Sequence, residues 1–273
     1  MHFADTILNT LTKVVPGNVW YFLLLLLVLP LPIETDLPIK RIPWVTYSLI
    51  AINIVVYGIT SPNARLDQGS AIFATWGVHS HATSPITFVT YAFLHVSPEH
   101  LFWNMVYLWL FGPHVEIALG KAAYVALYIG GGIAAALLHI SILTLMPQDS
   151  ALQVAPLVGA SGAISAILAP YALRFYRSQI RFIWLPALLF LRAYSRFEMA
   201  AITAIGLWLA ENVIMAGMSF YRTATVAYWA HLGGFVFGLV AAQLANLFNE
   251  GREDYAQQDA AAKLLNDGNS SAM

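Results

Sequence analysis

The sequence contains no cysteine among its 273 residues and little charge of either sign. Without cysteine, disulfides, thiolate metal sites and a cysteine nucleophile are excluded. Charged residues make up 10% of the chain and hydrophobic residues 59%, whereas soluble domains carry roughly 25% charge. This balance predicts a membrane protein. The net charge of −1 leaves no basic excess for binding nucleic acid, so we expect no nucleic-acid partner.

The sequence also lacks aspartates within its apolar stretches and the common histidine motifs for metal binding. Every aspartate lies outside the apolar stretches described below, which excludes the paired aspartates of an intramembrane aspartyl protease. No His-Glu-x-x-His motif occurs, and the run from His95 to His100 is one residue too long for the inverted version. We therefore expect neither a metal nor a cofactor. The chain also lacks an internal repeat of the kind that builds many transporters.

Six apolar stretches approach the length of about 20 residues that a helix needs to cross the hydrocarbon core. They cover residues 44–60, 100–119, 122–145, 158–176, 197–218 and 225–248. A further run at 20–31 is too short to span, and we expect it to lie at the membrane interface. The sequence thus predicts an all-α membrane protein with a six-transmembrane-helix bundle. We expect an N-terminal segment at 1–36, the membrane domain at 37–248 and a polar tail at 249–273.

Lys and Arg are distributed unevenly between the two sides of these spans. If the first span starts in the cytoplasm, ten of the thirteen lie on the cytoplasmic side and two, Arg65 and Arg222, lie outside. The positive-inside rule then places both termini in the cytoplasm. We expect a multi-pass protein embedded in the lipid bilayer of a bacterial inner membrane.

Uncharged polar residues gather near the outer ends of three spans. His100 and Asn104 lie four residues apart and therefore share one helical face. Ser161 lies about three residues into its span, and His231 about six residues into the last one. A helix rises 1.5 Å per residue, so these groups lie within roughly 10 Å of the outer boundary. Hydrophobicity alone does not require this common depth.

The residue types at this depth suit nucleophilic catalysis. A serine needs a neighbouring base at neutral pH, and His231 is the histidine at the depth of Ser161. His100, Asn104 and the Ser161 N–H are candidate donors to an oxyanion. No acidic third member is visible, so the sequence predicts a Ser–His dyad. The polar pair at 211–212 in the fifth span has no assignable partner.

The motifs around these residues resemble those of the rhomboid intramembrane serine proteases over about residues 37–248. They are His-x-x-x-Asn at 100–104, Gly-x-Ser-Gly at 159–162 and Ala-His-x-x-Gly at 230–234. The resemblance implies Ser161 as nucleophile, His231 as base and an oxyanion site with His100 and Asn104. It also implies six helices around a water-filled cavity, and transmembrane protein substrates with a single span that is cut near its outer end. Some members carry an aromatic residue four positions after the serine, where this chain has Ser165.

Two other functions compete with a protease. A lone serine between small residues is most often a packing residue, and the same polar cavity would suit a small-solute membrane transporter. A catalytically inactive rhomboid-like binding protein is the other alternative. A transporter predicts repeats, broken spans and a coupling acid, none of which the sequence shows convincingly.

Overall fold

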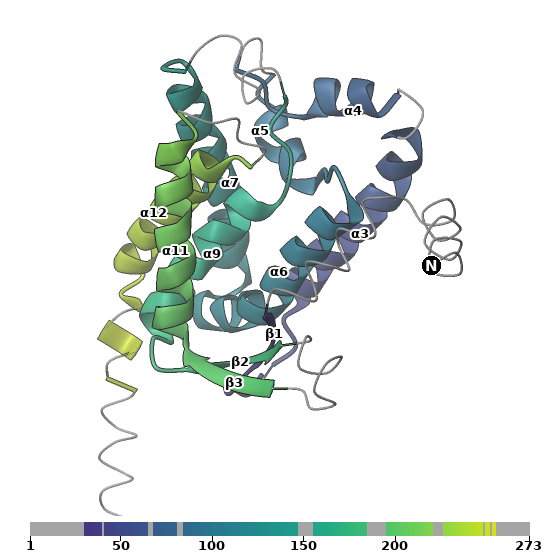
Figure 1. The fold of residues 1–273 in the computed structure, drawn as a ribbon. Coiled ribbons are helices and arrows are strands. Elements are labelled where there is room, and N and C mark those ends of the chain that lie inside the picture. Colours follow the sequence, from purple (N-terminus) through teal and green to yellow (C-terminus); the bar gives the residue numbers. More distant parts are fainter. Residues whose placement is uncertain are drawn as a thin grey trace, which may run out of the picture. The chain divides into compact units, whose positions relative to one another are not determined.

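The computed structural model describes residues 30–39, 41–64, 68–80, 84–146, 155–184, 195–220, 226–247, 249–251 and 253–254. The chain forms two compact units, one of residues 37–178 with 200–273 and one of residues 1–36 with 179–199. The first unit is helical (Figure 1). Its elements are α3 (Trp44–Ala64), α4 (Gln68–Trp76), α5 (Thr87–Thr90), the 3-10 helix η1 (Tyr91–Phe93), α6 (Pro98–Leu119), α7 (Lys121–Leu143), α9 (Ser161–Arg174), α11 (Ala201–Met218) and α12 (Tyr228–Leu244).

Helix α9 is the central helix of this unit. All its residues from Gly162 to Ala172 are buried, and it packs against α6, α7, α11 and α12 (Figure 1). Small residues make the close contacts possible. A Cβ at Gly131 of α7 would collide with the side chain of Ala166, and a Cβ at Gly238 of α12 would collide with the Ala166 backbone. Glycines on two neighbouring helices therefore let both backbones approach α9.

A buried carboxylate caps the start of α3. Glu116 of α6 accepts hydrogen bonds from the Val45 N–H at 3.0 Å, the Thr46 N–H at 2.7 Å and the Thr46 hydroxyl at 2.8 Å. The first N–H groups of a helix have no intrahelical acceptor, and its N-terminus favours negative charge. Glu116 thus ties α6 to the first turn of α3.

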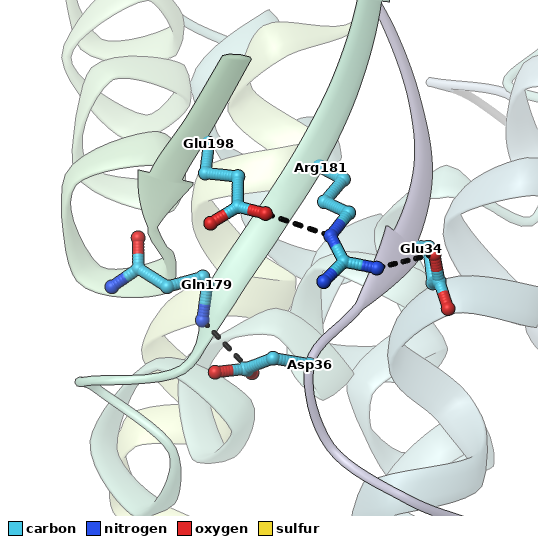
Figure 2. Close-up of polar contacts among 5 residues, drawn as sticks. All are labelled: Glu34, Asp36, Gln179, Arg181 and Glu198. Atoms are coloured by element: carbon cyan, nitrogen blue, oxygen red, sulfur yellow. Dashed lines mark hydrogen bonds and ion pairs between the residues drawn. The ribbon is translucent and has the colours of Figure 1, made fainter. Parts of the chain in front are cut away.

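The second unit contains a three-stranded sheet in the order β1-β2-β3, formed by β1 (Leu31–Thr35), β2 (Gln179–Trp184) and β3 (Ser195–Ala200). β1 and β2 are antiparallel. Figure 2 shows Arg181 between two carboxylates, donating to Glu198 at 2.7 Å and to Glu34 at 2.9 Å. The hydrogen bonds to Glu198 and Glu34 raise the pKa of the Arg181 guanidinium above its ordinary value. These side chains are exposed, so the ion pairs contribute little stability.

The expectation of an all-α fold is wrong for these three strands. Residues 197–200, expected at the start of the fifth span, belong to β3, and the expected interfacial run ends in β1 at Leu31. A strand pattern is present in β2, because every second residue is apolar at Ile180, Phe182 and Trp184, which is the period of a strand. The rest of the interfacial run and nearly all of the expected tail lie outside the described residues.

Long helices coincide with all six expected spans to within a few residues at most ends. In the described part of the chain, Lys121–Leu143 and Ala201–Met218 are long and apolar enough to cross a membrane. Trp44–Thr60 and Tyr228–Leu244 are shorter apolar helices. The connection between α3 and α6 contains α4, α5 and η1.

Candidate active site

Ser161 is the first residue of α9, and backbone hydrogen bonds hold the segment that precedes it. Leu157 pairs with Val78 through hydrogen bonds of 2.7 and 3.1 Å, and the Gly159 N–H donates to the Tyr91 carbonyl at 2.9 Å. These bonds hold the segment before Ser161 against residues of the connection between α3 and α6. The N–H of a residue in the first helical turn has no intrahelical acceptor, so that of Ser161 is available to another group.

Gly159 combines an unusual backbone conformation with a close neighbour. Its φ is 122°, a region that other residues rarely adopt. A Cβ there would lie 2.6 Å from Cε1 and 2.7 Å from Nε2 of His100. The His100 ring therefore packs directly on the backbone two residues before Ser161, and only glycine fits between them.

His231 lies in the first turn of α12 and faces Ser161. Its Nε2 is 2.8 Å from the Ser161 Oγ, which is a hydrogen bond. One turn further along, a Cβ at Gly234 would collide with the carbonyl oxygen of Gly162. The bare backbone of α12 thus allows the close approach that joins the serine and the histidine.

The other ring nitrogen of His231 contacts a residue for which the sequence supplied no role. Nδ1 is 2.7 Å from Oδ1 of Asn212 on α11. The Asn212 side chain is 3% exposed, and its Nδ2 donates to the Trp208 carbonyl at 2.8 Å. The rings of Trp208 and Tyr228 lie 6.0 and 6.2 Å from that of His231. His231 is therefore surrounded by polar and aromatic groups from α11 and α12.

The position of Asn212 along its helix is the sequence signal that could have identified it as a neighbour of His231. This residue lies six positions before the end of its helix at Met218, about 9 Å from that end at the rise of an α-helix. His231 lies equally deep in the predicted last span. The sequence left Asn212 without an assigned partner, because the depth of a residue does not show which helices are neighbours.

His100 and Asn104 occupy the first two turns of α6. Ser97 caps this helix, since its Oγ accepts from the His100 N–H at 3.3 Å. Nδ2 of Asn104 donates to the His100 carbonyl at 3.0 Å, within the same helix. Nδ1 of the His100 ring is buried without a hydrogen-bond partner in the described part of the chain, and its ring meets that of His95 edge-on at 5.1 Å. His100 thus lies beside the segment that precedes Ser161, whereas the Asn104 amide donates a hydrogen bond within its own helix.

Ser165, at the position where some rhomboids carry an aromatic residue, is buried one turn after Ser161. Its hydroxyl donates to the Ser161 carbonyl at 2.7 Å, which is a bond back to its own helix. The described residues contain no group of three or more His, Asp or Glu that could hold a metal ion. The polar groups that the structure brings together around Ser161 are hydroxyl, imidazole and amide groups.

A sequence model described as the rhomboid domain matches residues 82–246, which is more than half of the chain. The chain therefore belongs to the rhomboid family and is a helical membrane protein. This family consists mainly of intramembrane serine proteases, although some members are inactive. The resemblance seen in the three sequence motifs is confirmed.

Curated relatives come from eukaryotes and from a bacterium. "Rhomboid protein 1, mitochondrial" of Saccharomyces cerevisiae is 29% identical over 197 residues, which cover 71% of this chain and 51% of the relative. "Presenilin-associated rhomboid-like protein A, mitochondrial" of Danio rerio is 28% identical over 157 residues, 58% of this chain and 37% of the relative. "Putative rhomboid protease YdcA" of Bacillus subtilis is 30% identical over 135 residues, which cover 50% of this chain and 58% of the relative. The chain spans about half the length of the curated relatives it matches.

These relatives correct one expectation. We expected a bacterial inner membrane, but the yeast and zebrafish relatives, which match over longer stretches than the bacterial one, are mitochondrial. The mitochondrial location belongs to these relatives, and with them the expectation of a bacterial inner membrane for this chain is withdrawn. The bacterial assignment rested on the distribution of Lys and Arg, which orients a membrane protein but does not identify its membrane.

Proposed function

We propose that this chain is an intramembrane serine endopeptidase that cleaves transmembrane segments of single-span membrane proteins through Ser161 and His231. The observation that carries the proposal is the 2.8 Å hydrogen bond between the Ser161 Oγ and the His231 Nε2. A serine is a weak nucleophile until an adjacent base takes its proton. This pair lies at the helix ends in a family composed mainly of serine proteases.

In the proposed reaction, the Ser161 Oγ attacks the scissile carbonyl carbon while His231 Nε2 accepts the hydroxyl proton. His231 then gives this proton to the leaving amine, and an acyl-enzyme remains on Ser161. In the second step His231 takes a proton from a water molecule, and the hydroxide attacks the acyl carbonyl carbon and displaces the Ser161 oxygen, which receives this proton from His231. The original serine proton leaves on the amine and a water proton replaces it, so the pair is regenerated.

We assign the oxyanion site to the Ser161 N–H, His100 and Asn104. The Ser161 N–H has no acceptor within its own helix. The Asn104 amide carries two hydrogens, and its bond to the His100 carbonyl uses one. His100 is held against Gly159, two residues from the nucleophile. Donors placed in advance around a developing negative charge make a large contribution to catalysis.

We propose that α3, α6, α7, α9, α11 and α12 all cross the membrane, with both termini on the side rich in Lys and Arg. Ser161 and His231 then lie near the opposite surface, because α9 and α12 both start there. Substrates would be cut near the end of their span at that surface. The membrane domain keeps the proposed bounds of 37–248, between an N-terminal segment at 1–36 and a tail at 249–273.

The test uses the full chain reconstituted in liposomes with a single-span reporter protein. Ser161→Ala and His231→Ala should each lower the cleavage rate by on the order of 10³-fold or more. Ser141→Ala is the matched control, because Ser141 is an exposed serine of α7 that bonds back to the Leu137 carbonyl. Cleavage by Ser161→Ala at the parent rate would refute the assignment. A parent protein that does not cleave and does not react with a fluorophosphonate at Ser161 would instead favour an inactive rhomboid-like binding protein.

A further inference from the structure

The amide of Asn212 is bonded at both ends, and its two partners are not equivalent. One partner is the carbonyl oxygen of Trp208, four residues earlier on α11, at 2.8 Å. The other is a ring nitrogen of His231 on α12, at 2.7 Å. The amide is almost fully buried, so neither bond can be replaced by bulk water.

The Trp208 carbonyl determines which way this amide faces. A backbone carbonyl only accepts hydrogen bonds, so the NH₂ group of Asn212 must face Trp208. The amide oxygen then faces His231, and this oxygen only accepts. Nδ1 of His231 must therefore carry a hydrogen. In a neutral imidazole, a hydrogen on Nδ1 leaves the other nitrogen, Nε2, with a lone pair.

From this chain of donors and acceptors we infer that Asn212 is a positioning residue that holds His231 in the tautomer with Nδ1 protonated. This tautomer directs the Nε2 lone pair at the Ser161 hydroxyl, 2.8 Å away. The opposite tautomer would place an N–H on Nε2, which cannot accept the serine proton. The inference rests on the proposed function, and it extends the predicted dyad to an ordered Ser161–His231–Asn212 arrangement with a neutral third member.

The same contact supports the imidazolium that forms when His231 takes the proton. Both ring nitrogens are then donors, and the amide oxygen remains the acceptor for Nδ1. The amide carries no net charge, so it orients the ring without placing a carboxylate inside the membrane, where a charge is costly. Asn212 touches neither Ser161 nor the substrate, and it acts through His231.

The first test is spectroscopic and needs no catalytic activity. The full chain is labelled with ¹⁵N-histidine in lipid nanodiscs, and the His231 signals are identified by their loss in His231→Gln. At a pH high enough for the ring to be neutral, we expect Nδ1 to give the signal of a protonated nitrogen and Nε2 that of an unprotonated one. A parent spectrum with the hydrogen on Nε2 would overturn the inference, whatever the variants do.

The variants then separate tautomer selection from packing. Asn212→Leu removes the acceptor at similar volume, so we expect His231 to move toward the Nε2-protonated form. We expect kcat to fall about 10-fold to 100-fold with KM within about twofold, because the loss falls on general-base catalysis. Asn212→Asp keeps an acceptor and should retain the Nδ1-protonated ring and most of kcat.

Asn53→Leu is the matched control. Asn53 is also fully buried, and its Nδ2 donates to a carbonyl four residues earlier, that of Leu49 at 2.8 Å. Its oxygen has no hydrogen-bond partner among the described residues. We therefore expect the His231 spectrum of Asn53→Leu to match the parent. Unchanged His231 signals in Asn212→Leu would overturn the inference. A parent that shows the expected tautomer but cleaves no reporter would instead refute the proposed function alone.

Discussion

Replacing Gly238 with alanine should slow catalysis without touching any atom of the proposed dyad. Gly238 lies two turns beyond His231 on α12, where this helix crosses α9. A Cβ at this position would lie 2.9 Å from both the Cα and the carbonyl carbon of Ala166, and closer still to its oxygen. Backbone atoms cannot rotate away, so α12 itself has to move.

The size of that movement follows from these contacts. Ordinary van der Waals contact begins at 3.4 Å, so α12 must shift by at least about 0.5 Å to relieve the carbon contacts and by about 1 Å to clear the oxygen. A shift of 1 Å at His231 would stretch the 2.8 Å bond to Ser161 beyond hydrogen-bonding distance. A misplacement of 1 Å costs on the order of 10²-fold in rate. Because helix tilt absorbs part of the shift, we expect kcat to fall about 10-fold to 100-fold.

Reporter cleavage in liposomes measures this effect, with thermal unfolding of the same samples as a check on folding. Gly206→Ala on α11 is the matched control, because a Cβ there meets no atom within 4 Å. It should cleave like the parent and be slightly more stable, since alanine favours a helix over glycine by about 1 kcal/mol. Parent-like kcat in Gly238→Ala would refute the claim that this crossing sets the Ser161–His231 distance. An equal loss in Gly206→Ala would refute it as well.

Three further substitutions probe the supports of the site and the sheet. Gly159→Ala forces a side chain into a φ of 122° and against the His100 ring; we expect about 1–3 kcal/mol less stability and slower fluorophosphonate labelling of Ser161, and parent-like labelling would contradict this. Glu116→Gln replaces the charge that caps α3 and should cost about 1–3 kcal/mol, seen as a lower midpoint of thermal unfolding. Arg181→Met removes only exposed ion pairs, so its unfolding midpoint should match that of the parent in high salt, and a large loss there would contradict a weak role.

The position of a residue along its helix could be predicted from the sequence, and the neighbours of that helix in the bundle could not. Counting residues from the helix ends placed Ser161 and His231 at one level, and the structure joins them by a hydrogen bond. The same count, applied to Asn212 from the end of its helix at Met218, gives a similar level. It supplied no partner, because the contact between α11 and α12 depends on how the helices surround α9. Helix order around a bundle is set by packing, which spans alone do not encode.

The sheet was missed for a different reason. β1 pairs with β2 across about 150 residues of chain, so no local window contains both strands. Within β2 and β3 the alternation covers only six residues each, too short to compete with the hydrophobicity of the adjoining span. The strongly apolar composition therefore favoured helix for residues 197–200. Tertiary pairing decided the outcome there.

The small residue at 165 and the amide at 212 follow from one packing arrangement. Ser165 is buried, and its Cβ would lie 3.3 Å from a Cβ placed on Gly234 of α12. Because Ser165 is 1% exposed, an aromatic ring at 165 would have to displace the residues packed around it. Glycine in α12 lets His231 lie close to Ser161. The His231 ring then needs an orienting group from another helix, and Asn212 of α11 supplies it. An aromatic residue introduced at 165 should thus push α12 away from α9 and weaken the bond between His231 and Ser161. The small side chain of Ser165 and the amide of Asn212 therefore act together in orienting His231.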